Sequence, residues 1–400
     1  MHKNIDFISG VPFNSTAALR EIAKSVDGTY FILYTKPHPL EMGEFAVERM
    51  TAVADDMSAD MVYADHYELI AGADGKEVRR KHPLIECQKG ALRNDFDFGS
   101  VLLFNTDSFK AAVGAMDKDW NWGALYDLRL RMDRIVHINE YLYTEVETDL
   151  RKSGEKQFDY VDPRNREVQI EMEKICTDHL KRIGGYLKPE FRDVEISPLP
   201  SAGRDDREAG FPVTATVVIP VFNRIRTVKD AVESALNQEC DFPFNVIVVD
   251  NHSTDGTTAL LEEIAAKDKR LIHVVPERYD LGIGGCWNEA IDCEQCGKFA
   301  IQLDSDDVYS DENTLQKIVD TFYKEHCGMV VGTYKITDFK MNEIPPGIID
   351  HREWTPENGR NNALRINGLG APRAFYTPIL RELHVPNTSY GEDYALGLAI

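Results

Sequence analysis

Long hydrophobic runs are missing from this sequence. None of its apolar stretches approaches the roughly 20 residues that a membrane-spanning helix needs. The first residues, Met1-His2-Lys3-Asn4-Ile5-Asp6, also lack the apolar core of a signal peptide. We therefore expect a protein that has no transmembrane segment and stays in the cytoplasm.

Positive charge is scarce as well. The chain has 45 Lys and Arg residues against 67 Asp and Glu residues, which gives a formal net charge of −22. Nucleic acids and anionic membranes both attract proteins through a basic surface. We therefore exclude nucleic acid and anionic membrane as main partners.

Paired cysteines are also lacking. The seven cysteines are an odd number and show no disulfide framework, which is typical of a reducing compartment. Cys293-Glu294-Gln295-Cys296, with Cys286 nearby, could indicate zinc or redox chemistry. No second cysteine pair or histidine pair follows at zinc-finger spacing, so we do not favour a metal or redox role for these cysteines.

An acidic cluster is the most informative motif that is present. Asp304-Ser305-Asp306-Asp307 directly follows the apolar run Phe299–Leu303, which reads as a buried strand. Ligands of open α/β sheets bind at the carboxyl ends of the strands, and clustered carboxylates suit Mg²⁺ or Mn²⁺ that can also bind a diphosphate. The alternative is a solvated acidic turn before a helix that starts at Ser310 or Asp311.

Two strand-helix units precede this cluster. Thr216–Val221 is β-branched and is followed by apolar residues at helical spacing over Val228–Leu236. Val246–Val249 is the next strand, and Thr257–Ala266 the next helix. Strands alternating with helices predict a doubly wound, mostly parallel α/β sheet, with the polar strand tips converging on one crevice.

These motifs together resemble a known family. The matching stretches, in family order, are Val217–Asn223, Val248–Thr257, Gly282–Ala290, Leu303–Asp307 and Gly391–Tyr394. In these stretches the sequence resembles the family 2 glycosyltransferases, which are inverting enzymes with the GT-A fold. The resemblance implies a Rossmann-like, mostly parallel lobe that binds a nucleotide-diphosphate sugar.

The resemblance also implies roles for individual residues. The implied nucleotide-binding residues are Pro220, Phe222, Asn223, Arg224, Asp250, Asn251, Gly282, Asn288, Asp304 and Ser305. The implied ligands of a Mn²⁺ or Mg²⁺ cofactor are Asp304, Asp306 and Asp307, and the implied catalytic residues are Asp393, as general base, and Glu392. Phe222 stands where the family often has Tyr, and Asn251 where a second Asp is frequent, so the identity of the nucleotide stays open.

The expected reaction is metal-dependent, inverting transfer of a hexosyl or N-acetylhexosaminyl group. A UDP-sugar is the favoured donor, and a hydroxyl of a glycan or polysaccharide is the expected acceptor. A divalent cation would stabilise the leaving diphosphate, and a carboxylate is a competent base for the acceptor hydroxyl. Two alternatives stay open. Glu392 and Asp393 could merely favour a helix N-terminus, and the chain could be a catalytically silent carbohydrate-binding or scaffold protein.

The amino-terminal half resembles a degenerate partial copy of the same fold. Gly28–His38 aligns without a gap with Gly297–Asp307, and the weaker match of Asp60–Asp65 is with Gly328–Thr333. In this alignment Thr35, Pro37 and His38 stand at the positions of the acidic residues. An internal repeat that keeps its apolar pattern but loses its ionisable groups keeps a core and loses the chemistry.

A third alignment places Gly123–Leu130 against Gly391–Leu398, so Leu125 stands at the position of the proposed base. We expect this incomplete GT-A-like lobe to brace the active lobe, to dimerise or to bind the acceptor. Its aromatic residues Trp120, Trp122 and Tyr126 either stack on sugar or, as we favour, pack in a small core.

We predict three segments. Residues 1–150 form the degenerate lobe, and residues 214–400 form the catalytic domain. Residues 151–213 lie between them and contain an amphipathic helix over Arg164–Ile183 and an exposed connector over Pro198–Pro212. Within that domain, Lys340–Asn362 reads as a long loop for acceptor recognition or lid closure. We also expect the natural chain to continue beyond Ile400, because the last residues read as the start of a helix.

Overall fold

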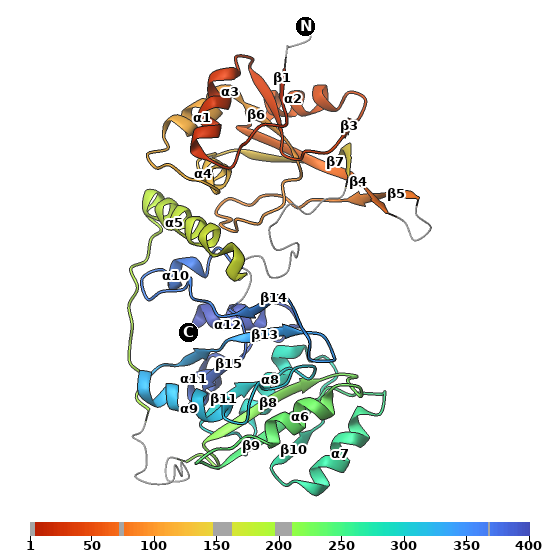
Figure 1. Cartoon of the computed structure of the whole chain (residues 1–400), viewed down its shortest axis with the longest axis vertical. Coiled ribbons are helices and arrows are strands. Elements are labelled where there is room, and N and C mark those ends of the chain that lie inside the picture. Colours follow the sequence, from red (N-terminus) through yellow and green to blue (C-terminus); the bar gives the residue numbers. More distant parts are fainter. Residues whose placement is uncertain (1–4, 72–75, 147–161, 197–209, 367–368) are drawn as a thin grey trace. The chain divides into compact units, whose positions relative to one another are not determined.

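A computed structural model describes residues 5–71, 76–146, 162–196, 210–366 and 369–400. The chain divides into two compact units, each with its own large sheet (Figure 1). The amino-terminal unit comprises Met1–Pro189 and Arg352–Ile366, and the carboxy-terminal unit comprises Glu190–His351 and Asn367–Ile400. Among the described residues, no helix is long and apolar enough to cross a membrane.

The carboxy-terminal unit is built on a six-stranded sheet. Its strands, from one edge to the other, are β10 (Leu271–Val274), β9 (Phe244–Asp250), β8 (Ala215–Val221), β11 (Phe299–Gln302), β15 (Arg373–Tyr376) and β12 (Met329–Val331). The first four strands are parallel to one another, whereas β15 runs antiparallel to both β11 and β12. The polar residues that follow β8, β9 and β11 therefore emerge at the same edge of the sheet.

Helices cover both faces of this sheet. Because successive side chains of a strand point to opposite faces, Val217 and Ile219 of β8 pack in one hydrophobic cluster and Val218 in another. The first cluster takes in α6 (Val228–Leu236), α7 (Thr257–Lys267) and α9 (Thr314–Glu325). The second takes in α8 (Ile283–Asp292), α11 (Thr377–Leu383) and α12 (Glu392–Ala399).

The structure confirms the predicted strand-helix units and the α/β class. It contradicts the loop expected over Lys340–Asn362. Glu343–Ile349 forms β14, which pairs with β13 (Tyr334–Thr337) in a two-stranded sheet, and Gly359–Asn362 forms the short helix α10. β14 contains two consecutive prolines followed by a glycine, which interrupt any alternation of polar and apolar residues, and such a strand is compatible only with a sheet edge.

The amino-terminal unit has a mixed seven-stranded sheet. Its strand order is β1 (Asp6–Ile8), β2 (Tyr30–Tyr34), β6 (Val101–Asn105), β4 (Met61–Ala71), β7 (Ile135–Val146) and β3 (Leu40–Met42), and β5 (Glu77–His82) also pairs with β4. Its helices are α1 (Thr16–Ser25), α2 (Ala46–Met57), α3 (Thr106–Gly114), α4 (Ala124–Arg129) and α5 (Arg166–Ile183), with a 3₁₀ turn at Pro163–Asn165. The core of this unit includes Trp120 and Tyr126, which agrees with the packing interpretation of these two aromatic residues.

Part of this sheet has the same order and strand directions as part of the carboxy-terminal sheet. The strands β1, β2, β6 and β4 correspond to β8, β11, β15 and β12. The hydrogen bonds at the strand ends correspond as well. The backbone N–H of Thr106 donates to the Thr29 carbonyl at 3.0 Å. In the same way, the backbone N–H of Thr377 donates to the Lys298 carbonyl at 2.9 Å. The backbone N–H of Asn105 donates to the Asp60 carbonyl, and the backbone N–H of Tyr376 donates to the Gly328 carbonyl. Both distances are 2.9 Å.

The amphipathic helix α5 starts two residues later than predicted and ends at Gly184, whose φ of 75° suits a glycine C-cap. Ile175, Cys176 and Leu180 of α5 lie in the core of the amino-terminal unit. The segment 352–366 also belongs to this unit, and its buried Arg365 donates to the Gln169 amide oxygen at 2.7 Å. The predicted connector over Pro198–Pro212 lies largely outside the described residues.

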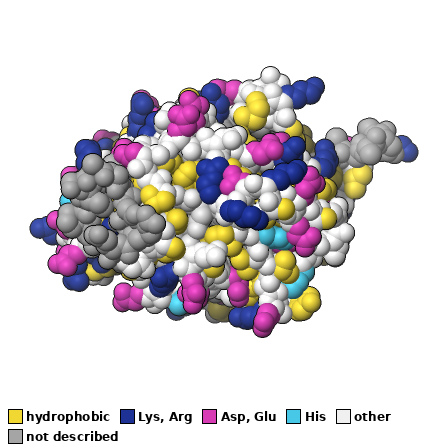
Figure 2. Space-filling model, turned by 90° about the horizontal axis from the view of Figure 1, so that it is seen from below, with side chains coloured by type: hydrophobic (Ala, Val, Ile, Leu, Met, Phe, Trp, Pro, Cys, Tyr) yellow, Lys and Arg dark blue, Asp and Glu magenta, His cyan; other side chains and the backbone are white. Residues whose placement is uncertain are grey.

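All seven cysteines are free thiols. On the face drawn in Figure 2, the acidic and basic side chains that the structure describes are interspersed.

Candidate active site

The loops after β8 and β9 hold each other through hydrogen bonds. Asn223 has a φ of 54°, and its amide N–H donates to the Ser253 hydroxyl at 2.9 Å. The Asn223 side-chain oxygen accepts from the Thr254 N–H at 2.7 Å. Arg224 donates its backbone N–H to the Thr257 hydroxyl at 3.0 Å. The predicted nucleotide-binding residues Asn223 and Arg224 therefore lie on a loop whose shape is fixed by its neighbour.

Asp250, at the end of β9, is fully buried. Its carboxylate accepts from the Ser253 N–H at 3.0 Å and from the Thr258 hydroxyl at 2.5 Å. Burial opposes the charged form of Asp250, but the hydrogen bonds from Ser253 and Thr258 outweigh it and lower the pKa of this carboxyl. Asp250 thus organises the loop after β9, and its contact with a nucleobase stays a prediction.

Phe222 and Pro220 lie on the β8 side of the same edge. The Phe222 side chain is 55% exposed, which is unusual for an aromatic residue directly after a core strand, and Pro220 is half-buried. An exposed ring at the tip of a parallel strand is available to stack on a flat ligand.

The amino-terminal end of α8 is fastened to the segment before Glu392 and Asp393. Gly282 donates its N–H to the Asn387 amide oxygen at 2.8 Å. The Asn288 side chain makes two hydrogen bonds of 2.8 Å to the backbone of Val385. Asn251 donates to the Leu281 carbonyl at 2.9 Å, so the loop after β9 joins the same network. Gly282, Asn251 and Asn288 therefore position loops in this structure.

The acidic cluster follows β11 as a tight turn, in which the Asp307 N–H donates to the Asp304 carbonyl at 3.1 Å. Asp304 accepts from the Gln302 amide at 2.8 Å, and Asp306 lies 3.6 Å from the Arg224 guanidinium. Ser305 is buried beneath them. Arg224, on the loop after β8, thus brings a positive charge to the carboxylates after β11.

The carboxylates of this cluster repel one another. Loss of hydration, together with repulsion by Asp304 and Asp306, raises the pKa of Asp307 to about 6. Loss of hydration also raises the pKa of Asp304, which is exposed but crowded, and the charges of Asp306 and Asp393 add to this effect. A cation among these groups would relieve the repulsion.

Asp304, Asp306 and Asp307 nevertheless do not converge into a ready-made three-ligand site. In the described residues, the one group of three or more His, Cys, Asp or Glu side chains with ligand atoms all within 4.8 Å of one another is His66, Glu68 and His82. The acidic cluster therefore offers a cation fewer than three convergent side chains, and bound phosphate oxygens or water would complete its coordination.

Asp393 and Glu392 open α12 after Gly391. Asp393 Oδ2 lies 2.5 Å from Arg373 Nη1, and Asp393 Oδ1 accepts from the Tyr394 N–H at 2.7 Å. Loss of hydration raises the pKa of Glu392, and the charges of Asp393 and Asp304 raise it further. The Asp393 side chain is 29% exposed, so it does not lie in the core. The backbone N–H of Arg373 donates to the Gln302 side-chain oxygen at 3.2 Å, which links this ion pair to the acidic cluster.

Comparison with known proteins identifies this unit. Residues 216–383 match the model of glycosyl transferase family 2. This part of the chain belongs to that family. Its sheet order and the family match together make the carboxy-terminal unit a GT-A lobe, as the sequence predicted. Glu392 and Asp393 lie just beyond the matched residues.

Individual relatives agree with the family match. The chain is 29% identical over 164 residues to an uncharacterized glycosyltransferase of Haemophilus influenzae. This match covers 41% of this chain and 48% of that protein. It is 31% identical over 121 residues, 30% of this chain and 46% of the relative, to the putative teichuronic acid biosynthesis glycosyltransferase TuaG of Bacillus subtilis. The chain thus spans about half the length of these two relatives.

Among solved structures, S. aureus TarS 1–349 in complex with UDP-GlcNAc is similar at 25% sequence identity and a TM-score of 0.37. The match covers 46% of this chain and 52% of that one.

Arg373 is the residue of the glycosyltransferase domain that the sequence interpretation missed. It opens β15 and is largely buried, with its side chain 13% exposed. No spacing rule links it to Asp393, which lies 20 positions later, because the two meet only when β15 inserts between β11 and β12. The one signal in the sequence was an Arg at the start of a short apolar run that comes before the acidic pair Glu392 and Asp393.

Proposed function

We propose that the chain is an inverting glycosyltransferase that moves a sugar from a nucleotide-diphosphate sugar to a hydroxyl of a glycan or polysaccharide. The observation that carries the proposal is a chain of contacts that joins Asp393 to the acidic cluster. Asp393 pairs with Arg373, whose backbone N–H donates to the Gln302 side-chain oxygen at 3.2 Å, and the Gln302 amide donates to Asp304 at 2.8 Å. These two carboxylates are 89 positions apart in the sequence, and the fold brings them to one edge of the sheet. A site for a departing diphosphate and a general base for an acceptor are thereby within reach of one substrate.

Carboxylates from the cluster Asp304, Asp306 and Asp307, together with bound phosphate oxygens or water, would hold a Mn²⁺ or Mg²⁺ ion. Carboxylate oxygens are the ligands that these hard cations prefer, and the raised pKa values of Asp304 and Asp307 indicate a place where positive charge is favoured. When bound, the ion would supply Lewis-acid stabilisation of the leaving diphosphate. Arg224, beside Asp306, would add a further positive charge on the nucleotide side.

Asp393 would act as the general base. Its ion pair with Arg373 holds one carboxylate oxygen in place, and a general base has to be held within reach of the proton that it accepts. Glu392 lies beside it with one buried oxygen that has no hydrogen-bond partner, so this oxygen would be free to accept from a sugar hydroxyl.

A UDP-sugar is the favoured donor, and both hexosyl and N-acetylhexosaminyl groups remain open. The exposed Phe222 ring and the loop of Asn223 and Arg224 would border the nucleoside. A catalytically silent carbohydrate-binding protein is the second candidate. It is less favoured because Asp304, Asp306, Asp393 and Arg373 occur together, whereas the corresponding positions of the amino-terminal unit hold Thr35, Pro37, Leu125 and Leu102.

Calorimetric titration of the purified chain with UDP, in Mn²⁺ and then in EDTA, tests this proposal. We expect saturable binding that requires the metal and is lost in Asp306→Ala. Asp268→Ala is the matched control, because Asp268 precedes β10 at the opposite edge of the sheet and pairs with Arg270 at 2.7 Å. UDP binding that is equally tight in EDTA, or that survives in Asp306→Ala, would contradict the metal assignment.

A further inference from the structure

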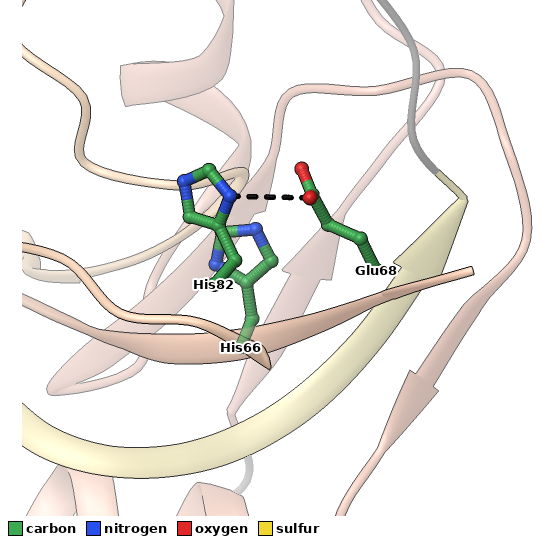
Figure 3. A group of neighbouring side chains, drawn as sticks. All are labelled: His66, Glu68 and His82. Carbon is green, nitrogen blue, oxygen red and sulfur yellow. Dashed lines mark ion pairs between the residues drawn. The ribbon is translucent and has the colours of Figure 1, made fainter. Parts of the chain in front are cut away.

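Two histidines and a glutamate of the amino-terminal unit lie on one face of its sheet. His66 and Glu68 are two residues apart on β4, so their side chains point to the same face. His82 of β5 stands directly opposite His66 in the strand pairing. One ligand atom from each of the three side chains lies within 4.8 Å of the others. Figure 3 shows the His82 ring beside that of His66 and facing the Glu68 carboxylate.

This group is buried, although its residues are polar. His66 is 2% exposed and Glu68 is 5% exposed. The two imidazole rings stack with centroids 4.5 Å apart, and His82 Nδ1 lies 3.2 Å from Glu68 Oε2. Two ligands on a tetrahedral zinc ion are about 3.3 Å apart when the bonds are about 2.0–2.1 Å long, so this pair already has the separation that such an ion requires.

Further carboxylates contact the two rings. Glu145 Oε1 of β7 lies 3.2 Å from His66 Nε2, and Asp97 Oδ2 lies 3.0 Å from His82 Nε2. The Tyr143 hydroxyl lies 3.3 Å from His66 Nδ1. Histidines that bind a metal commonly donate the N–H of their other ring nitrogen to a carboxylate, which orients the ring. The His82 ring has this arrangement. Its Nδ1 faces Glu68, on the side of the group, and its Nε2 contacts the Asp97 carboxylate on the other side.

The charges around the group favour a cation. Glu68, Asp97 and Glu145 contribute three carboxylates, and Arg80 and Lys36 pair with Glu68 and Glu145 respectively. The five named groups thus leave one negative charge next to two imidazoles. The carboxylate that has no Arg or Lys partner among these five is that of Asp97, whose side chain is 52% exposed. Its charge favours a cation on the solvent side of the group.

We propose that His66, Glu68 and His82 form a zinc-type divalent metal site, with one nitrogen from each imidazole and one Glu68 oxygen as ligands. Two imidazoles and one carboxylate are a known three-residue ligand set for Zn²⁺, and a water molecule would take the fourth position on the side of the partly exposed His82. The ion would tie β5, which pairs only with β4 in the described sheet, to the buried strand β4. This site is separate from the acidic cluster of the glycosyltransferase domain, whose all-oxygen ligands suit Mn²⁺ or Mg²⁺.

Metal titration of the full chain in the Asp306→Ala background tests the proposal, because this background removes the acidic cluster as a competing site. The chelator-treated protein is titrated with Co²⁺, followed by visible absorption, and then with Zn²⁺ in equilibrium dialysis. We expect one equivalent of Zn²⁺ per chain, displacement of Co²⁺ by Zn²⁺, and a higher melting temperature with Zn²⁺ than with EDTA.

Variants separate a metal site from a hydrogen-bonded network. His82→Gln is expected to weaken Zn²⁺ binding by more than the about 10–100-fold that loss of an outer carboxylate costs, and Asp97→Asn to weaken it within that range. His137→Gln is the matched control, because His137 is also held by a carboxylate, that of Asp65 at 2.8 Å, but lies outside the group. It should leave the zinc stoichiometry unchanged.

Three results would overturn the proposal. The first is less than one equivalent of Zn²⁺ bound at micromolar concentration by the parent chain. The second is a Co²⁺ spectrum without the intense bands of a tetrahedral site. The third is Zn²⁺ affinity that is the same in His82→Gln and in the parent. The first two need no ligand variant, so the test holds even if His82→Gln fails to fold.

Discussion

At the scale of single residues, the ion pair of Arg373 with Asp393 is the feature that joins the two parts of the proposed active site. Asp393 comes from the first turn of α12, and Arg373 from the start of β15. The same Arg373 charge opposes the raised pKa values of Asp304 and Glu392. One guanidinium therefore influences three carboxylates at this edge of the sheet.

Arg373→Gln should lower turnover while leaving donor affinity nearly unchanged. Arg373 acts through Asp393, so its loss should misplace the base without touching the nucleotide. We expect kcat to fall by about 10-fold or more, and Arg373→Lys to recover part of the loss because it keeps the charge but not the planar guanidinium. Steady-state kinetics measure the split between kcat and KM. A rise in donor KM at unchanged kcat would contradict the positioning role, and Arg270→Gln, which breaks a surface ion pair, is the control.

Asp307 should make the folded protein less stable as the pH rises. Its pKa is about 6 in the folded state and 3.8 as an ordinary Asp, so the folded chain binds a proton that the unfolded chain has released between these values. This group's contribution to stability is therefore lost as pH rises from about 4 to about 6. Asp307→Asn should raise the melting temperature of the metal-free chain at pH 7.5 and have little effect near pH 4. Calorimetric scans at both pH values measure this, and a lower melting temperature of the variant at pH 7.5 would refute it.

The acidic residues of the site could be predicted from the sequence, whereas their partners could not. Asp304, Asp306 and Asp393 stand out because acidic groups follow apolar runs that form strands or precede a helix. The buried hydrogen bonds of Asp250 with Ser253 and Thr258 depend on the fold of a loop, and no local pattern distinguishes a carboxylate that binds a ligand from one that holds its own loop.

At the scale of elements, the start of α8 packs so closely against the segment before α12 that its glycines have no room for a side chain. A Cβ on Gly284 would lie 1.9 Å from the Pro386 carbonyl oxygen, and one on Gly282 would lie 2.5 Å from the Thr388 backbone. These glycines allow the backbone of residues 386–388 to lie against the start of α8. That backbone leads directly into Glu392 and Asp393.

Gly284→Ala should therefore displace the segment before the proposed base. We expect a stability loss of about 1–3 kcal/mol, the usual cost of overpacking, and a fall in turnover larger than that of a surface variant. Gly114→Ala is the matched control, because a Cβ there meets nothing within 4 Å and alanine favours the end of α3. Urea unfolding and turnover at one temperature measure both effects. Equal stability of Gly284→Ala and Gly114→Ala would contradict the close packing.

The elements that the sequence predicted are those with strong local patterns. The apolar runs of β8, β9 and β11 and the helical periodicity of α5 and α6 are local signals. β14 was missed because its two prolines and its glycine interrupt the strand pattern and fit a strand only at a sheet edge. The insertion of β15 between β11 and β12 depends on contacts across the chain, which periodicity does not encode.

At the scale of the whole molecule, the chain holds two units with a partly shared strand order. In the shared register, Leu102 of β6 stands at the position of Arg373, and Leu125 of α4 at the position of Asp393. Both members of the ion pair are thus apolar in the amino-terminal unit, and Thr35 and Pro37 replace the two acids of the cluster. We interpret this unit as a copy of the fold that has lost the transfer site.

The full chain should accordingly bind one nucleotide and not two. At the aligned positions of the two units, acidic residues follow β11 but not β2, so calorimetry with UDP and Mn²⁺ should give a stoichiometry near one. Thr35→Ala, at the position corresponding to Asp304, should leave this stoichiometry and affinity unchanged. A second, equally tight site that survives Asp306→Ala would contradict the interpretation of the amino-terminal unit.

The most direct test of the central claim is the rate at which the chain releases nucleoside diphosphate from a panel of nucleotide sugars in Mn²⁺, with and without Asp393→Asn. Asn keeps the shape of Asp but cannot accept the proton, so we predict a fall of about 10²–10⁴-fold for the preferred donor with nearly unchanged donor affinity. Glu392→Gln should reduce the rate less. No release from any donor by the folded chain, or equal rates for the parent and Asp393→Asn, would contradict an active transfer site built on these residues.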